Sequence, residues 1–163
     1  MGCKAKLLVK FIAVDLKRKK ILALNVTSKK VADGRMLQPL VEEASEKAKV
    51  TKTLGDGEYD TKSNFHYLAG KKIEPVIKIR KNASNKAGVC MPIKLVAQEY
   101  LHDPQAWKHH HSYGQRWMVE SAFSSLKRTF GEYVTARKFR NMTKEMILKT
   151  SLYNLFIGLT VTP

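Results

Sequence analysis

The stretch KLLVKFIAVDLKRKKILALNVT, from Lys6 to Thr27, contains two aliphatic runs separated by a short basic segment. Runs of this length that are rich in aliphatic and β-branched residues are typical of β-strands, and a short polar connection between two of them predicts an antiparallel hairpin. The connection lacks the Asn-Gly pair that favours the tightest hairpin turns. We therefore expect the fold to begin with a hairpin over residues 6–27.

After the hairpin, helical and extended patterns alternate along the chain. This order predicts one α/β domain covering residues 1–163, because neither an internal repeat nor a low-complexity linker divides it. Thr61 is expected to cap one of the short helices, and Gly70 to follow the end of that helix. The expected elements are a helix over 33–49, a strand ending before Asp56, a helix over 61–70, a strand over 74–80, and helices over 115–130 and 142–159.

The pattern is less regular over residues 81–112. The polar segment 81–88 is expected to be an exposed loop, and residues 89–112 are left without an assigned structure. Within them, residues 92–101 are compatible with a short helix, and residues 103–112 with the loop that leaves it.

The charge of the chain restricts its partners. Thirty Lys and Arg residues against fourteen Asp and Glu residues give a net charge of +16. Such an excess attracts polyanions, nucleic acid first and anionic membrane second. No segment has the long apolar run of a membrane helix, so a membrane partner is not expected. Cys3 and Cys90 form neither a disulfide framework nor a zinc-ligand pattern, which favours a reducing compartment.

The helix expected around residues 113–128 carries a narrow polar stripe. At about 100° per residue, Tyr113, Arg116, Glu120 and Lys127 fall within an arc of roughly 60°. The apolar residues gather mainly on the other side, so the helix buries one face and exposes the stripe. From spacing alone, a solvated face with a weak ion pair between Arg116 and Glu120 is the simplest interpretation.

A catalytic interpretation needs a second carboxylate, and Asp56 is placed to supply it. Asp56 follows a short strand, and ligands in open α/β sheets gather at the carboxyl ends of strands. Gly55 and Gly57 leave room for a metal ion or a phosphate. Divalent metals in phosphoryl transfer require carboxylates that converge from different elements. The alternative is a plain acidic turn in which Asp56 or Asp60 caps the next helix.

The segments LGDGEYDTKSNFHYL (54–68) and YGQRWMVESAFSSLKR (113–128) closely resemble the DDE transposases of bacterial and archaeal insertion sequences. That family carries Tyr, two residues, Arg, three residues, Glu, six residues and Lys around its catalytic glutamate. This sequence matches the pattern at Tyr113, Arg116, Glu120 and Lys127. Asp56 matches the second catalytic aspartate of the family. Residues 21–44 and 141–155 also resemble family segments, so the resemblance covers nearly the whole chain.

The resemblance implies an α/β fold with an RNase H-like mixed sheet flanked by helices, and two Mg²⁺ (or Mn²⁺) ions. It implies cleavage and strand transfer of DNA at the ends of an insertion sequence, in the cytoplasm and close to the nucleoid of a prokaryote. Asp56 and Glu120 would be the catalytic metal ligands, and Tyr113, Arg116 and Lys127 would hold DNA phosphates. Other basic residues, including those of 17–20 and 78–81, would add sequence-independent affinity for DNA.

The sequence departs from the family at one catalytic position. Three acidic residues are needed, and neither Asp15 nor Asp33 matches the position of the first aspartate. The strand that carries this aspartate is expected to be missing, which makes the chain an N-terminally truncated copy that binds DNA weakly and does not cut it. Loss of that strand exposes a sheet edge, so pairing with a second chain, including a homodimer, is expected.

Two further classes of function remain open. One is a DNA-binding remnant of a transposase with a regulatory role and no catalysis. The other is a basic RNA-binding protein, although no aromatic RNA-recognition motif is visible.

The adjacent His109, His110 and His111 suggest a metal site, but adjacent histidines in a polar loop are more often solvated.

Overall fold

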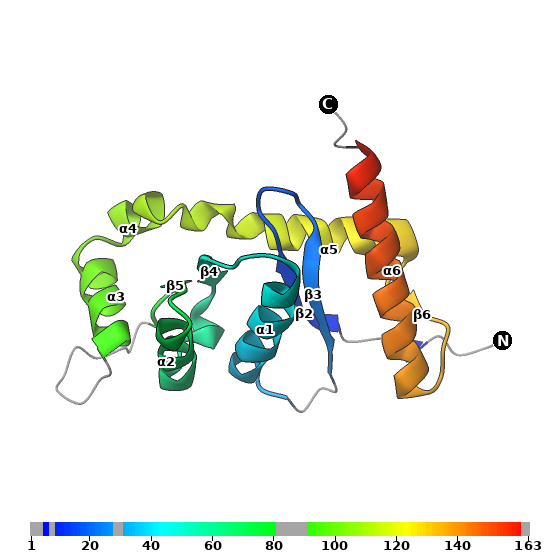
Figure 1. The fold of residues 1–163 in the computed structure, drawn as a ribbon, viewed down its shortest axis with the longest axis horizontal. Coiled ribbons are helices and arrows are strands. Elements are labelled where there is room, and N and C mark those ends of the chain that lie inside the picture. Colours follow the sequence, from blue (N-terminus) through cyan, green and yellow to red (C-terminus); the bar gives the residue numbers. More distant parts are fainter. Residues whose placement is uncertain (1–4, 7–8, 28–30, 81–90, 161–163) are drawn as a thin grey trace. The chain divides into compact units, whose positions relative to one another are not determined.

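The structure is a computed structural model that describes residues 5–6, 9–27, 31–80 and 91–160 (Figure 1). Within these residues it contains six α-helices and three two-stranded sheets, which confirms the α/β class. The chain divides into two compact units. The first unit combines residues 1–31 with residues 117–163, and the second comprises residues 32–116. The expectation of one domain over 1–163 stays a prediction.

The first unit contains the expected hairpin. Strand β2 (Val9–Val14) pairs antiparallel with strand β3 (Ile21–Val26), with two register irregularities. Asp15 organises the turn between them, because its Oδ1 accepts hydrogen bonds from the backbone amides of Lys17 (2.9 Å) and Arg18 (3.3 Å). Lys19 completes the turn at a φ of 56°, in the left-handed region. These hydrogen bonds give Asp15 a structural role in the turn. No role in metal binding is needed to explain its position.

Two helices complete the first unit, α5 (Trp117–Phe130) and α6 (Phe139–Thr160). Asn154 of α6 binds both backbone groups of Ile21, since its Oδ1 accepts from the Ile21 amide (2.8 Å) and its Nδ2 donates to the Ile21 carbonyl (2.7 Å). A small pair between β1 (Ala5–Lys6) and β6 (Tyr133–Val134) was not expected from the sequence. The buried core consists of Ile21, Ala122, Leu126, Val134, Met146 and Tyr153.

Glu145 links α6 to the segment that follows β6 through hydrogen bonds. Its carboxylate accepts hydrogen bonds from the backbone amides of Thr135 (2.9 Å) and Ala136 (3.0 Å), and it pairs with Lys149 at 3.1 Å. Burial raises the pKa of Glu145, but these hydrogen bonds and the Lys149 charge outweigh burial and hold the pKa below its usual 4.5. The ionised carboxylate therefore stabilises the folded unit.

We expect Glu145→Ala to lower the free energy of unfolding by about 1–2 kcal/mol at neutral pH, because charge-assisted hydrogen bonds are lost. Since the folded pKa is lowered, the contribution is present above 4.5 and disappears as the pH falls below it. Urea unfolding of both proteins across this range checks the prediction. In Glu132→Ala, which breaks only an exposed pair with Lys127, the change should stay below about 0.5 kcal/mol. Equal losses of stability in Glu145→Ala and Glu132→Ala would contradict this role of Glu145.

The second unit contains a parallel strand pair. Strand β4 (Lys52–Gly55) pairs with β5 (Glu74–Ile77), with Gly55 opposite Ile77. The other elements are η1 (Asp33–Met36), α1 (Leu37–Lys47), η2 (Gly57–Tyr59), α2 (Lys62–Gly70), α3 (Met91–His102), α4 (Pro104–His110) and η3 (Tyr113–Arg116). The core consists of Leu37, Val41, Phe65, Leu68, Ile73, Ile77, Ile79, Ile93 and Ala97.

Several details of the second unit confirm or correct the sequence analysis. Thr61 caps α2, as its side chain accepts from the Asn64 amide at 3.3 Å. Gly70 is the last residue of α2 and does not follow it, and the left-handed residue is Lys72, with a φ of 56°. Residues 103–112, which were left unassigned and compatible with a loop, contain α4, which Asp103 caps. The expected loop 81–88 lies outside the described residues.

The described strands form separate two-stranded sheets, so the RNase H-like mixed sheet stays a prediction. Among the described residues, no helix combines the length and apolar character needed to cross a membrane.

Candidate active site

Asp56 lies directly after β4, where the carboxyl ends of the two parallel strands meet. It caps the short helix η2, because its Oδ1 accepts a hydrogen bond from the Glu58 amide at 3.0 Å. Its side chain is 44% exposed. The local alternative from the sequence, a capped acidic turn, is therefore correct as a description of the backbone. It leaves the second carboxylate oxygen of Asp56 available for other contacts.

Arg80 holds the acidic turn, residues 56–60, against the segment that follows β5. Its Nε donates to the Gly57 carbonyl at 2.7 Å, and its Nη2 lies 3.4 Å from Oε2 of Glu58. The backbone amide of Arg80 donates to Oδ2 of Asp60 at 3.0 Å. From the sequence Arg80 was expected only to add general DNA affinity, whereas in the structure its guanidinium fixes this turn.

A buried amide fixes the other side of the acidic turn. Asn64 is 1% exposed, and its Nδ2 donates to the carbonyls of Gly34 (2.8 Å) and Tyr59 (3.0 Å). A Cβ on Gly34 would lie 2.9 Å from the Glu58 carbonyl oxygen, so this close approach requires glycine. A groove of about 500 Å³ lies along this contact. Its lining includes Asp33, Arg35, Gln38, Glu58, Ser63 and Arg80.

The ring of Tyr59 lies next to Gly55, the residue before Asp56. A Cβ on Gly55 would lie 3.2 Å from this ring. Burial, followed by the charges of Asp56 and Asp33, raises the pKa of Tyr59 from 10.0 to about 12. The phenol therefore remains neutral at physiological pH and adds no negative charge beside Asp56.

The second unit also positions two of the basic and aromatic residues that the sequence singled out. Arg116 ends η3, and its Nη1 lies 3.9 Å from Oδ2 of Asp56. Tyr113 begins η3, and its ring centroid lies 5.4 Å from that of Trp107, a residue that is 2% exposed. The structure therefore brings Arg116 to Asp56 and supports Tyr113 on a buried aromatic ring.

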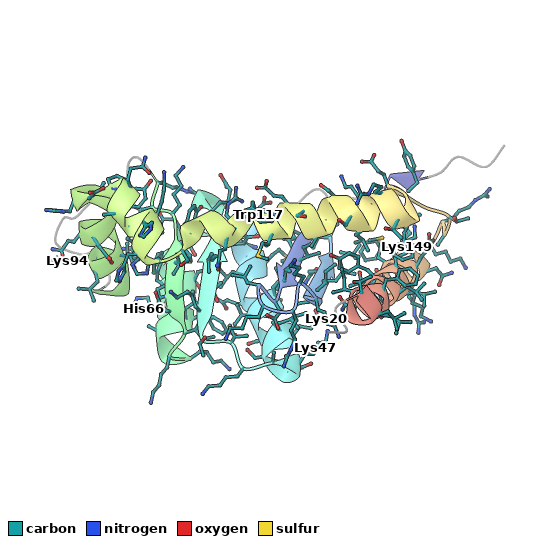
Figure 2. The ribbon with its side chains drawn as sticks, turned by 90° about the horizontal axis from the view of Figure 1, so that it is seen from above. Lys20, Lys47, His66, Lys94, Trp117 and Lys149 are labelled. Atoms are coloured by element: carbon teal, nitrogen blue, oxygen red, sulfur yellow. The ribbon has the colours of Figure 1, made fainter. Side chains whose placement is uncertain are left out.

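Glu120 and Lys127 lie on α5, which belongs to the first unit. The helix packs through Ala122 and Leu126, and Glu120 lies on its exposed surface. Lys127 extends over the ring of Phe123 at 4.8 Å and lies 3.4 Å from Oε1 of Glu132. Figure 2 labels Trp117 at the first turn of α5, where its side chain is 60% exposed.

The expected helix over 115–130 needs one correction. It begins at Trp117, because Tyr113–Arg116 forms a tighter 3₁₀ turn. An α-helical wheel therefore does not relate Tyr113 and Arg116 to Glu120 and Lys127, and the narrow arc applies only to the last two. The fixed spacing of the four residues reflects a turn joined to a helix.

The family model for the transposase DDE domain matches residues 4–155. No solved structure gives a significant match to the chain.

Proposed function

The chain belongs to the transposase DDE domain family, and on this premise we propose that it binds DNA and carries part of a metal-dependent site for phosphodiester cleavage and strand transfer. The observation that supports this proposal most directly is the placement of Asp56. It follows a strand, keeps an exposed carboxylate and lies 3.9 Å from a guanidinium. The guanidinium can pair with a DNA phosphate, and the carboxylate can hold a divalent cation beside that phosphate.

We assign Asp56 and Glu120 as metal ligands. Both are carboxylates, the oxygen donors that Mg²⁺ and Mn²⁺ prefer, and both lie at exposed positions of their units. Oδ1 of Asp56 accepts from the turn and Oδ2 lies 3.9 Å from the Arg116 guanidinium, so an ion bound at Oδ2 would lie beside this guanidinium. A bound divalent ion would neutralise negative charge on the scissile phosphate.

Arg116, Lys127 and Tyr113 are assigned to DNA phosphates. A guanidinium beside Asp56 can bind phosphate oxygens through two parallel hydrogen bonds. The exposed amine of Lys127 supplies a second positive charge, and the Tyr113 hydroxyl can donate a hydrogen bond. These contacts position DNA without reading its sequence. Pairing with a second chain and a location near the nucleoid stay predictions.

We expect duplex DNA to bind, with an affinity that falls about 1,000-fold between 50 and 200 mM salt, as for roughly six phosphate contacts. Arg116→Ala and Lys127→Ala should each weaken binding and lower the slope of log affinity against log salt by about one. Fluorescence anisotropy with labelled duplexes measures both quantities. In Lys47→Ala, which removes an amine paired with Glu43 outside the motif, the slope should change less. Equal slopes in all variants, or preference for structured RNA, would contradict the proposal.

The same proteins can be tested for cleavage of DNA. With Mg²⁺ or Mn²⁺, the chain is expected to bind DNA carrying insertion-sequence ends without nicking it, because no acidic residue before Asp56 matches the first aspartate of the family. Metal-dependent nicking that disappears in Glu120→Gln would contradict this expectation. DNA binding that is unchanged in Asp56→Asn and independent of metal would favour a non-catalytic DNA-binding module.

A further inference from the structure

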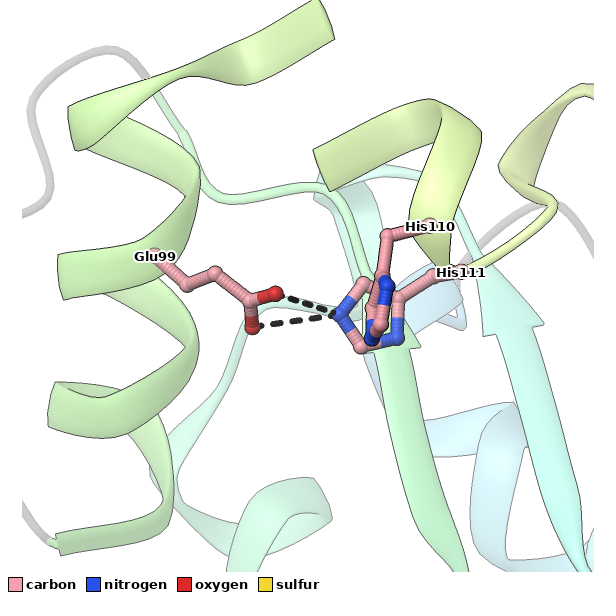
Figure 3. Close-up of side chains that lie close together, drawn as sticks. All are labelled: Glu99, His110 and His111. Atoms are coloured by element: carbon pink, nitrogen blue, oxygen red, sulfur yellow. Dashed lines mark hydrogen bonds and ion pairs between the residues drawn. The ribbon is translucent and has the colours of Figure 1, made fainter. Parts of the chain in front are cut away.

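A cluster of potential metal ligands lies in the second unit outside the residues assigned above. Glu99 comes from α3, His110 is the last residue of α4, and His111 follows it (Figure 3). Nε2 of His111 lies 3.0 and 3.1 Å from the two carboxylate oxygens of Glu99. One ligand atom from each of the three residues lies within 4.8 Å of the others.

The two neighbouring histidines lie at the end of α4. His111 has a φ of −86° and a ψ of 3°, and Ser112 then enters the left-handed region at a φ of 54°. The rings of His110 and His111 meet edge to face, with centroids 4.9 Å apart. Adjacent residues inside a regular helix would point about 100° apart. The ring contact nevertheless leaves one ligand atom of each imidazole within 4.8 Å of a Glu99 carboxylate oxygen.

Glu74 orients the central imidazole. Nδ1 of His111 lies 2.8 Å from Oε1 of Glu74, and Glu74 also pairs with Lys52 at 3.1 Å. The His111 ring packs 5.2 Å from buried Trp107, and its side chain is only 16% exposed. A carboxylate that accepts from Nδ1–H fixes the tautomer and presents the Nε2 lone pair, which is the usual arrangement around a metal-binding histidine.

We propose that Glu99, His110 and His111 bind a divalent transition metal of the zinc type. Two imidazoles and one carboxylate match the ligand preference of Zn²⁺, whereas Mg²⁺ prefers an all-oxygen set. The 3.0 Å separation between Nε2 and Oε1 is compatible with two ligands that each lie about 2.0–2.2 Å from one ion. Water completes the coordination on the exposed side.

The bound ion joins α3 to the end of α4, a few residues before η3. That turn carries Tyr113 and Arg116, and Arg116 lies beside Asp56. The metal is therefore a structural element that holds the residues leading to η3. Its existence does not depend on the proposed DNA chemistry.

A metal-free arrangement would use the same atoms differently. An imidazolium form of His111 would donate from both nitrogens, to Glu74 and to Glu99. In that arrangement His110 contributes nothing to binding, and added Zn²⁺ finds no site. The two arrangements thus differ in their response to metal and to substitution of His110.

The test is calorimetric titration of the purified chain with ZnCl₂ at neutral pH under reducing conditions. We expect one Zn²⁺ per chain, with affinity lowered at least 100-fold in His111→Ala and at least tenfold in His110→Ala. Glu74→Gln should lower it about 10- to 100-fold, because Glu74 orients a ligand. His109→Ala is the matched control, since His109 is an exposed histidine of the same helix outside the cluster, and its affinity should be unchanged.

Circular dichroism checks that each variant is folded, and X-ray absorption at the zinc edge identifies the ligands. Scattering from imidazole and oxygen at about 2.0–2.2 Å without sulfur supports the site. Absence of Zn²⁺ binding, equal weakening in His109→Ala, or sulfur ligation by cysteine would overturn it.

Discussion

Replacing Asn64 with leucine is expected to lower the free energy of unfolding of the second unit by about 1–3 kcal/mol. Leucine has similar size but no polar atoms. The substitution removes the two hydrogen bonds of Nδ2 and leaves the carbonyls of Gly34 and Tyr59 without this donor. A buried polar group that loses its partner costs roughly 1–3 kcal/mol, and the Tyr59 carbonyl still accepts from the Thr61 amide at 2.8 Å.

The result is measured by urea unfolding at neutral pH, followed by the fluorescence of Trp107, the buried tryptophan of the second unit. Gln38→Leu is the matched control, because Gln38 is also an amide in the groove lining but donates to Ser63 at the surface. It should change stability by less than about 0.5 kcal/mol. Equal destabilisation by both substitutions would show that the fixation of the acidic turn does not depend on the buried amide.

The loss of Asn64 also affects the site. Asn64 connects the turn at Gly34 to Tyr59, three residues after Asp56, while Arg80 holds Gly57 from the other side. The bonds of Asn64 to Gly34 and of Arg80 to Gly57 join residues 30 and 23 positions apart in the chain. They depend on the packed second unit, so the position of the Asp56 carboxylate is a property of this unit and not of the turn alone.

The sequence predicted the elements with strong local signals. The hairpin of β2 and β3 follows from two aliphatic runs, and α1 buries Leu37, Leu40, Val41 and Ala44 at the spacing expected of a helix. The strand before Asp56 and the cap at Thr61 also agree with the structure. In each case the information lies within a few neighbouring residues.

Helix α4 was missed although the sequence carried a signal for it. Asp103 followed by Pro104 is a typical helix start, because the aspartate accepts from amides of the first turn and proline needs no donor there. The three adjacent histidines at the end of α4 favour a polar loop on local grounds. The strands β1 and β6 are two residues long, too short for any pattern to predict.

The remaining details are non-local. The bonds of Arg80 to Gly57, of Asn64 to Gly34 and of His111 to Glu74 join residues 23, 30 and 37 positions apart. No local pattern in the sequence indicates such pairs. The candidate site residues could be identified from their match to a family, whereas the contacts that position them required the structure.

The most direct test of the central proposal, that Asp56 and Glu120 are metal ligands, is a Mn²⁺ titration followed by paramagnetic broadening of backbone amide signals. We expect the amides of Gly57 and Ser121, next to the two carboxylates, to broaden over the same range of Mn²⁺ concentration. Asp56→Asn and Glu120→Gln should each weaken this effect at least tenfold, and Glu132→Gln should leave it unchanged. Broadening that survives both substitutions, or that occurs only around Glu99 and His111, would contradict the proposal.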